Sequence, residues 1–318
     1  MLKLAVLMDP ISTIKPYKDS SFAMLLEAQK RNWQLHYLEI GDLLWQQNQS
    51  YGKTRRLRVK DDNQDWFSLD EEFSLTPLAE MNVILMRVDP PFNMEYLYAT
   101  HLLEQAQRTG TLVVNNPTAL RDANEKLFTL WFPQCIPNTL VSSNAKQINH
   151  FIQEHQDIII KPLDAMGGAS IFRIRKGDPN TSVIIETITE YQTKHVMLQR
   201  FIPEVSQGDK RILLIDGEPI KYGLARIPAK GETRGNLAAG GTGKGVELTK
   251  RDFWICDQVS STLKEKGLLF VGLDVIGDYL TEINVTSPTC IRELDSMYGL
   301  NIAGQLMDSI EMKLKTKT

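Results

Sequence analysis

Short apolar runs alternate with helical patterns in the first part of the chain, and this alternation constrains the fold most. Residues 2–8 form an apolar run, and residues 20–32 carry apolar side chains at helical spacing behind the capping candidate Asp19. Further buried strands are expected at 35–40, 83–86 and 112–114, and a helix at 96–107. Residues 46–64 form a polar excursion rich in Gln and Arg. Strands that alternate with helices predict a parallel α/β domain.

After residue 122 the pattern favours antiparallel pairs. Runs at 158–160 and 171–174 flank a glycine-containing turn at 166–170, and runs at 211–215 and 220–227 flank Asp216-Gly217-Glu218-Pro219. A helix is expected at 182–191, followed by a strand at 196–202. Strand runs with segregated helices predict an α+β second half.

Charge and cysteine content limit the partners. In 318 residues, 36 Lys and Arg stand against 39 Asp and Glu, so the formal net charge is −3. This balance provides no global field for nucleic acid or anionic lipid. Cys135, Cys256 and Cys290 lie far apart with no CxxC pair, and no run approaches the ~20 apolar residues of a membrane span. We therefore expect a cytoplasmic protein that binds neither nucleic acid nor membranes.

Residues 231–245 hold six of the chain's 20 glycines. A surface loop is the ordinary interpretation of such a segment. The functional interpretation is a lid that closes over an anionic ligand. The segment contains neither of the two common glycine-rich nucleotide motifs, so a nucleotide would have to be held in another way.

The hairpin at 271–285 carries the most specific chemistry. Glu282 and Asn284 are two residues apart and share one strand face. Asp274 lies opposite Glu282 if the loop is residues 277–279, whereas a two-residue loop puts Asp274 on the other face. Neighbouring carboxylates with an amide oxygen suit Mg²⁺. A solvated strand face is the alternative, and the sequence leaves both open.

Several motifs occur in the order found in one enzyme superfamily. They are Lys161-Pro162 with the loop 166–170, Gln199-Arg200-Phe201-Ile202, Gly208-Asp209-Lys210-Arg211, the segment 231–236, and Thr281-Glu282-Ile283-Asn284-Val285-Thr286-Ser287-Pro288-Thr289. This order resembles the ATP-grasp ligases, and nearly the whole chain is similar to the bacterial glutathione synthetase family. Ala165 departs from the glycine common in that family and should only stiffen the loop.

The resemblance implies a domain plan and a reaction. The plan is an N-terminal α/β substrate domain at 1–122 and an α+β ATP-grasp domain whose subdomains, 123–200 and 201–318, clasp ATP, with a lid at 228–245. The reaction is ATP-dependent joining of γ-glutamylcysteine to glycine through an acyl phosphate, which gives glutathione, ADP and phosphate. The metal cofactor would be Mg²⁺, with Mn²⁺ as the alternative, and the assembly a homotetramer.

The resemblance also assigns residues to roles. The catalytic residues would be Arg211, Arg226 and Arg234. The nucleotide would be bound by Lys126, Lys161, Gly167, Gly168, Gln199, Arg200, Phe201, Ile202 and Asp209. The metal ligands would be Asp274, Glu282 and Asn284. The substrate would contact Arg87, Asn284, Ser287, Thr289 and Glu293.

Ordinary structural roles compete with these assignments. Lys126 alone would be interpreted as an exposed helix residue. Arg211 and Arg226 flank a hairpin, where cross-strand ion pairs are common. Arg87 could form a surface salt bridge with Asp89. Cys290 is expected to be structural.

Two other functions also compete. One is a different carboxylate-amine ligase of the superfamily, such as a D-alanine-D-alanine or ribosomal-protein glutamate ligase. The other is a catalytically silent ATP-binding regulatory module, as in the synapsins. The presence of Arg211 disfavours the silent module, because ATP binding alone does not require a catalytic arginine.

Overall fold

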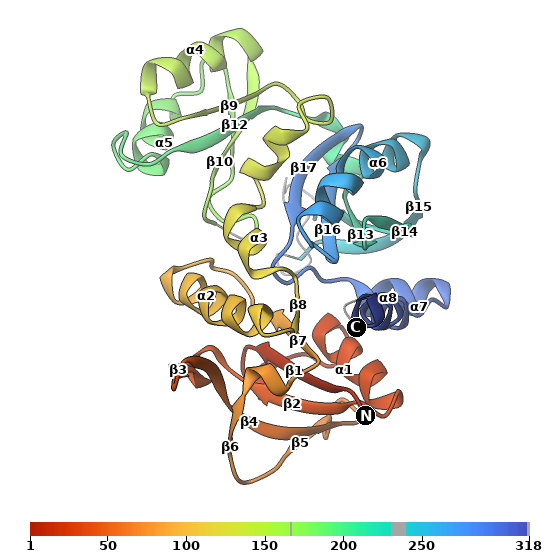
Figure 1. Cartoon of the computed structure of the whole chain (residues 1–318). Helices are drawn as coiled ribbons and strands as arrows, with labels where there is room; N and C mark the ends of the chain where they lie inside the picture. Colours follow the sequence, from red (N-terminus) through yellow and green to blue (C-terminus); the bar gives the residue numbers. More distant parts are fainter. Residues whose placement is uncertain (166, 230–239, 317–318) are drawn as a thin grey trace.

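The computed structural model describes residues 1–165, 167–229 and 240–316. Within these residues the strands form three sheets that follow one another along the long axis of the molecule (Figure 1). The N-terminal sheet lies at one end, a five-stranded antiparallel sheet in the middle and a four-stranded antiparallel sheet at the other end. This arrangement confirms an α/β part followed by an α+β part.

The N-terminal sheet has the order β3-β4-β2-β1-β7-β8, and β5 and β6 also pair with β4. The strands are β1 (Lys3–Met8), β2 (Gln34–Leu38), β3 (Leu43–Gln46), β4 (Gln49–Val59), β5 (Phe67–Leu69), β6 (Ser74–Pro77), β7 (Val83–Arg87) and β8 (Leu112–Val114). The helices are α1 (Ser20–Lys30), α2 (Met94–Arg108) and α3 (Pro117–Asp122). Strand β1 is parallel to β2 and β7, and β7 is parallel to β8. These pairings confirm the expected parallel core.

The expected parallel pairing does not extend to residues 46–64, which the sequence suggested to be a polar excursion. That segment contains β4, which pairs antiparallel with β2, β3, β5 and β6. Leu57 and Val59 are buried, whereas Arg58 between them is exposed. The alternation of a strand is therefore present, but polar residues conceal it in the sequence.

The four-stranded sheet has the order β11-β10-β12-β9. Its strands are β9 (Thr139–Ser142), β10 (Asp157–Pro162), β11 (Phe172–Arg175) and β12 (Val196–Arg200), and the helices are α4 (Ala145–His155) and α5 (Thr181–Ile188). Ile158 and Ile160 of β10 pack in a core with Ile148 of α4 and Ile185 of α5. The alternate β10 residues, Ile159 and Lys161, lie on the opposite face and line a cavity.

The five-stranded sheet has the order β15-β14-β13-β16-β17. Its strands are β13 (Asp209–Ile215), β14 (Glu218–Ile227), β15 (Thr242–Glu247), β16 (Phe270–Ile276) and β17 (Tyr279–Asn284), and the helices are α6 (Lys250–Glu265), α7 (Ile291–Tyr298) and α8 (Ile302–Thr316). Ile212 and Leu214 share a core with Val259 of α6. By strand alternation, Arg211 and Leu213 lie on the other face.

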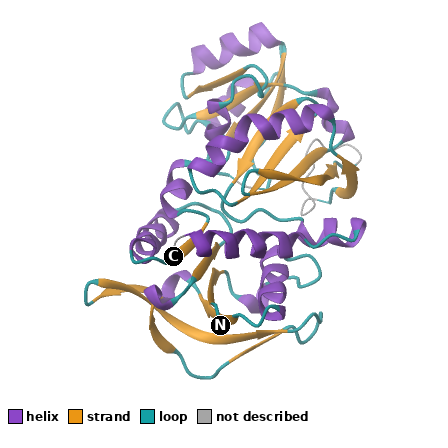
Figure 2. Cartoon of the chain, turned by 45° about the vertical axis from the view of Figure 1, so that its right-hand side comes forward, coloured by secondary structure: helices purple, strands orange, loops and turns teal. Residues whose placement is uncertain are grey.

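The C-terminal helix α8 packs against the N-terminal part of the chain. It runs between the N-terminal and five-stranded sheets (Figure 2). Leu306 and Ile310 belong to one core cluster with Leu25 of α1 and Leu213 of β13. The C-terminal helix thus fixes the N-terminal sheet beside the sheet that carries Arg211.

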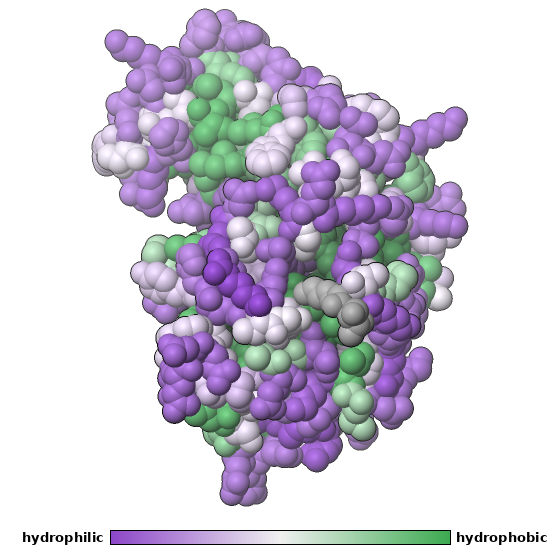
Figure 3. Space-filling view, viewed as in Figure 1, coloured by the Kyte–Doolittle hydropathy of each residue, from purple (hydrophilic) through white to green (hydrophobic). Residues whose placement is uncertain are grey.

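The surface seen from the side of Figure 1 is largely hydrophilic, and apolar side chains gather over the four-stranded sheet (Figure 3). No helix in the described part of the chain is both long and apolar enough to cross a membrane.

Candidate active site

A cavity of about 350 Å³ lies between the four-stranded and five-stranded sheets. It collects most of the residues that the family resemblance selected. Those on its lining are Lys126, Lys161, Gly167, Gly168, Gln199, Arg200, Phe201, Ile202, Asp209, Arg211, Arg226, Asp274, Glu282, Asn284, Ser287 and Thr289.

The β16–β17 hairpin places Asp274 opposite Glu282 through a β-bulge that the sequence did not reveal. Ile276 pairs with Tyr279 across a two-residue turn, yet Asp274 pairs with Glu282 because Thr281 is an extra residue in β17. Such a bulge shifts the alternation of side chains by one. Leu280 therefore packs in the core, while Glu282 lines the cavity.

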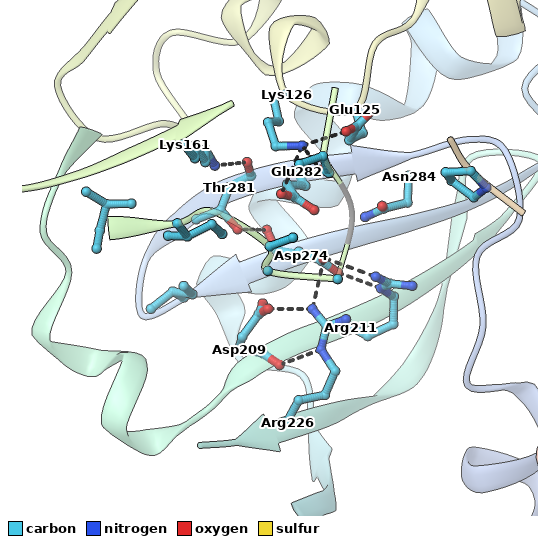
Figure 4. Close-up of a pocket in the computed structure, with 18 of the residues that line it drawn as sticks. Glu125, Lys126, Lys161, Asp209, Arg211, Arg226, Asp274, Thr281, Glu282 and Asn284 are labelled. Atoms are coloured by element: carbon cyan, nitrogen blue, oxygen red, sulfur yellow. Dashed lines mark hydrogen bonds and ion pairs between the residues drawn. The ribbon is translucent and has the colours of Figure 1, made fainter. Parts of the chain in front are cut away.

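Arg211 and Asp274 form a buried two-point ion pair on adjacent strands (Figure 4). Arg211 Nε donates to Asp274 Oδ1 at 2.5 Å, and Nη2 donates to Oδ2 at 3.0 Å. Arg226 Nη2 lies 2.9 Å from Asp274 Oδ2 and also pairs with Asp209. Cross-strand pairing is thus present, but it is located on the cavity wall.

The two aspartates of this cluster differ in their proton affinity. Burial alone would raise the pKa of Asp274, but Arg211 and Arg226 outweigh it and hold that pKa well below its usual range. Burial raises the pKa of Asp209 to about 6, although Arg226 opposes the change. Asp274 is therefore the fixed negative charge of the cluster.

Two buried lysines, Lys126 and Lys161, lie near Glu282 at another part of the lining (Figure 4). Lys126 Nζ donates to Glu125 Oε1 at 2.6 Å and to the Ala165 carbonyl at 2.8 Å, and lies 3.9 Å from Glu282 Oε1. Lys161 Nζ donates to the Thr281 carbonyl at 3.2 Å. Burial lowers the pKa of Lys161 and raises the pKa of Glu282. Lys126 is thus not the exposed residue that its local sequence suggests.

The oxygen donors fit a divalent cation that also binds phosphate. Asn284 Nδ2 donates to the Gly272 carbonyl at 3.3 Å, so the amide oxygen is left for another partner. Glu282 and Asn284 line the cavity from one strand. Among the described residues, no group of three His, Cys, Asp or Glu side chains has metal-site geometry. Mg²⁺ does not require one, because it binds through one or two carboxylates together with waters and phosphates.

An apolar part of the lining offers space for a flat ring. It contains Ile159, Phe201, Ile202 and Ile276. The Arg173 guanidinium lies 3.4 Å from the centroid of the Phe201 ring, which holds that ring in place. These side chains give this part of the cavity an apolar surface.

Two of the expected residues lie elsewhere, and a third is outside the described residues. Arg87 is buried outside the cavity lining, where its Nε donates to Ser21 Oγ at 2.9 Å and its Nη2 to the Pro288 carbonyl at 2.9 Å. Glu293 also does not line the cavity. Arg234 lies outside the described residues, as does much of the expected lid at 228–245. Arg87 is buried and donates to Ser21 and Pro288, so the alternative of a surface salt bridge with Asp89 was wrong.

Sequence reasoning missed two residues that shape the site. Glu125 lines the cavity and pairs with Lys126; its position beside that lysine was the available signal. Asn115 donates to the Phe270 and Val285 carbonyls, both at 2.7 Å, and accepts from the Phe270 N–H. A polar residue directly after the apolar strand β8 was the signal there.

Comparisons with known proteins agree over the whole chain. The model of the N-terminal domain of prokaryotic glutathione synthetase matches residues 2–121, and that of its ATP-grasp domain matches residues 125–299. The chain is 58% identical to the glutathione synthetase of Yersinia pestis, which covers 100% of this chain and 99% of the relative. It is 57% identical to that of Escherichia coli strain K12, covering 99% of each.

Solved structures of low identity share the fold. The D-cycloserine synthetase DcsG superposes with a TM-score of 0.69 at 12% identity, covering 98% of this chain and 99% of that one. An ATP-grasp ligase of Chryseobacterium gregarium superposes with a TM-score of 0.67 at 14% identity, covering 98% and 97%. These similarities confirm the fold of an ATP-grasp ligase.

Proposed function

This chain belongs to the prokaryotic glutathione synthetase family, and on that premise we propose how its residues perform the ligation. It is an ATP-dependent ligase that joins γ-glutamylcysteine to glycine. Both substrates are small molecules, and the family uses a divalent metal. The observation that carries the assignment of residues is the one cavity that Lys126 and Lys161, the Arg211–Asp274 pair and Glu282 all line.

The lysine part of the cavity is proposed to bind the phosphates of ATP. Lys126 and Lys161 supply positive charge in a buried setting, where a phosphate oxygen binds more strongly than in water. Glu282 and Asn284 would hold Mg²⁺ or Mn²⁺, with Asp274 close by. A bound metal would supply positive charge that offsets the negative charge of the phosphates. Gly167 and Gly168, both at positive φ, allow the loop backbone to approach the nucleotide.

The arginine cluster is proposed to stabilise the reacting carboxyl group. Transfer of the γ-phosphoryl group of ATP to the γ-glutamylcysteine carboxylate gives an acyl phosphate and ADP. Attack by the glycine amine then gives a tetrahedral oxyanion, which expels phosphate as the amide bond forms. Arg211 and Arg226 are held rigidly by Asp274 and Asp209, so their remaining N–H groups are preorganised for that negative charge. Arg234 is proposed as a third positive group on the basis of the family motif.

The dipeptide is proposed to lie along the segment that follows β17. Asn284, Ser287 and Thr289 line the cavity there. Arg87 reaches this segment from the N-terminal sheet through the Pro288 carbonyl, so it positions the segment. Glu293 lies in the first turn of α7 outside the lining, and a contact with the α-amino group of the dipeptide would require a shift of this segment.

We also propose the domain divisions 1–122, 123–200 and 201–318, which the separate sheets support, although α8 packs on the N-terminal part.

A homotetramer is proposed from the family resemblance. Trp45 of β3, Leu75 of β6 and Phe73 just before β6 are exposed, and such apolar side chains support an interface. A cytoplasmic location is proposed because the three cysteines are free thiols.

The function is tested by measuring ADP release with γ-glutamylcysteine and glycine, each omitted in turn, and with D-alanine in their place. We expect ADP release only with both substrates and a divalent metal. Release with D-alanine alone would assign the chain to another ligase class. ATP binding without release under any condition would favour a silent regulatory module. Addition of Mg²⁺ or Mn²⁺ to metal-stripped protein identifies the preferred ion.

A further inference from the structure

A short chain of hydrogen bonds lies on the edge of the four-stranded sheet. Thr139 of β9 is paired in register with Gln199 of β12. The Gln199 side-chain Nε2 donates to Thr139 Oγ1 at 3.2 Å, and Thr139 Oγ1 donates to the Pro137 carbonyl at 2.7 Å. None of the functional assignments above uses Thr139.

This chain of bonds fixes the direction of the Gln199 amide. A carbonyl oxygen can only accept, so the one hydroxyl proton of Thr139 is committed to Pro137. Thr139 Oγ1 then offers only lone pairs to Gln199, and the amide must present its NH₂ group. A flipped amide would place two acceptors against each other. The carbonyl oxygen of Gln199 therefore points away from Thr139.

Gln199 lies beside the apolar part of the cavity lining. Gln199 is paired with Ile159 of β10, and both line the cavity with Phe201 and Ile202. Among the described residues, the hydrogen bond to Thr139 is the one that the Gln199 side chain makes. The backbone N–H groups of Arg200 and Phe201 already donate to the Asn138 and Asp157 carbonyls. The Gln199 oxygen is thus an acceptor with a set direction beside the space for a base.

We propose that Thr139 is a positioning residue that makes the nucleotide site select adenine over guanine. The amino group N6 of adenine is a hydrogen-bond donor, whereas guanine carries the acceptor O6 at the same position. An acceptor-only Gln199 oxygen binds the first and repels the second. The proposal rests on the proposed function in that it takes the cavity as the ATP site, and it adds the residue that sets base selection.

The test compares nucleotide preference in Thr139 variants of the full-length enzyme. Rates of ADP and GDP release with γ-glutamylcysteine and glycine give kcat/KM for ATP and for GTP. Thr139→Val keeps the shape but removes the hydroxyl, so the amide loses its fixed direction. We expect the ATP:GTP ratio of kcat/KM to fall about tenfold, the scale of one hydrogen bond. Thr139→Ser retains the hydroxyl and should keep the ratio of the wild type.

A double-mutant cycle shows whether Thr139 acts through Gln199. In a Gln199→Leu background, which also lowers the ratio, Thr139→Val should have no further effect on it. A wild-type ratio in Thr139→Val, an equal loss in Thr139→Ser, or an additive loss in the double variant would overturn the proposal. If Thr139→Val does not fold, the comparison of Thr139→Ser with Thr139→Ala provides the same test. Absence of ligation in the wild type would instead contradict the proposed function.

Discussion

Arg211 holds Asp274 by two hydrogen bonds across neighbouring strands, and both side chains are buried on the cavity wall. The pair explains two features at once. It neutralises a carboxylate that faces Glu282, and it presents a rigid guanidinium to the cavity. Asp274 therefore serves Arg211 as an anchor as well as being a candidate metal ligand.

Replacement of Arg211 by Ala should lower turnover more than ATP affinity. If the guanidinium stabilises charge that develops during ligation, kcat should fall by roughly 10² to 10³, while the Kd for ATP changes little. Steady-state rates and calorimetric titration with ATP measure the two quantities. A large loss of ATP affinity with kcat nearly intact would make Arg211 a nucleotide anchor.

The same variant should also be less stable. It leaves Asp274 buried with Arg226 as its remaining arginine partner, and breaking a buried ion pair costs about 3–5 kcal/mol. Denaturant unfolding measures this loss. Arg58→Ala removes the exposed pair with Asp70 and should change the stability by at most about 1 kcal/mol.

Replacement of Glu282 by Gln should weaken use of the metal rather than folding. The change removes one negative ligand and keeps the shape, so the Mg²⁺ concentration for half-maximal activity should rise and kcat should fall. Asp278→Asn, in the exposed turn of the same hairpin, is the matched control and should behave as the wild type. Wild-type metal dependence in Glu282→Gln would remove Glu282 from the metal site.

Asp209 should make folding stability fall as the pH rises from about 4 to about 6. Its pKa is raised from 3.8 to about 6 in the folded protein, so in this window the folded state binds more protons than the unfolded state. Asp209→Asn should make this slope shallower by the equivalent of up to one bound proton, because the variant lacks the titrating carboxyl group. Unfolding free energies at several pH values measure the slope. An unchanged slope would show that Asp209 does not titrate in this range.

The strand and helix patterns predicted most of the fold because they depend on local alternation. Residues 271–276 and 279–285 were correctly expected to form a hairpin around Gly277 and Asp278. Its register could not be derived, since the Thr281 bulge depends on how Leu280 packs in the core rather than on a local signal. The opposition of Asp274 and Glu282 was therefore one of two open alternatives.

Most residues of the candidate site could be predicted from the sequence, but their contacts could not. The motifs selected Arg211, Asp274 and Lys161, and all three line one cavity. The contacts of expected site residues come from distant segments. Arg87, for example, donates to the Pro288 carbonyl, 201 residues away. No sequence pattern specifies such a pairing, because it depends on how α8 and the sheets pack together.

Replacement of Asn115 by Ala should destabilise the junction between the N-terminal and five-stranded sheets. The Asn115 side chain makes three buried hydrogen bonds to the backbone of Phe270 and Val285, and its loss leaves these backbone groups without that partner. At about 1–3 kcal/mol for each unsatisfied buried group, the free energy of unfolding should fall by about 3 kcal/mol or more. Asn82→Ala, which removes one exposed bond to the Lys3 N–H, is the matched control and should have a much smaller effect. Because Val285 leads into Ser287, the KM for γ-glutamylcysteine should also rise in the Asn115 variant while the Kd for ATP changes little. Equal stability losses in the two variants would show that the Asn115 bonds do not hold the sheets together.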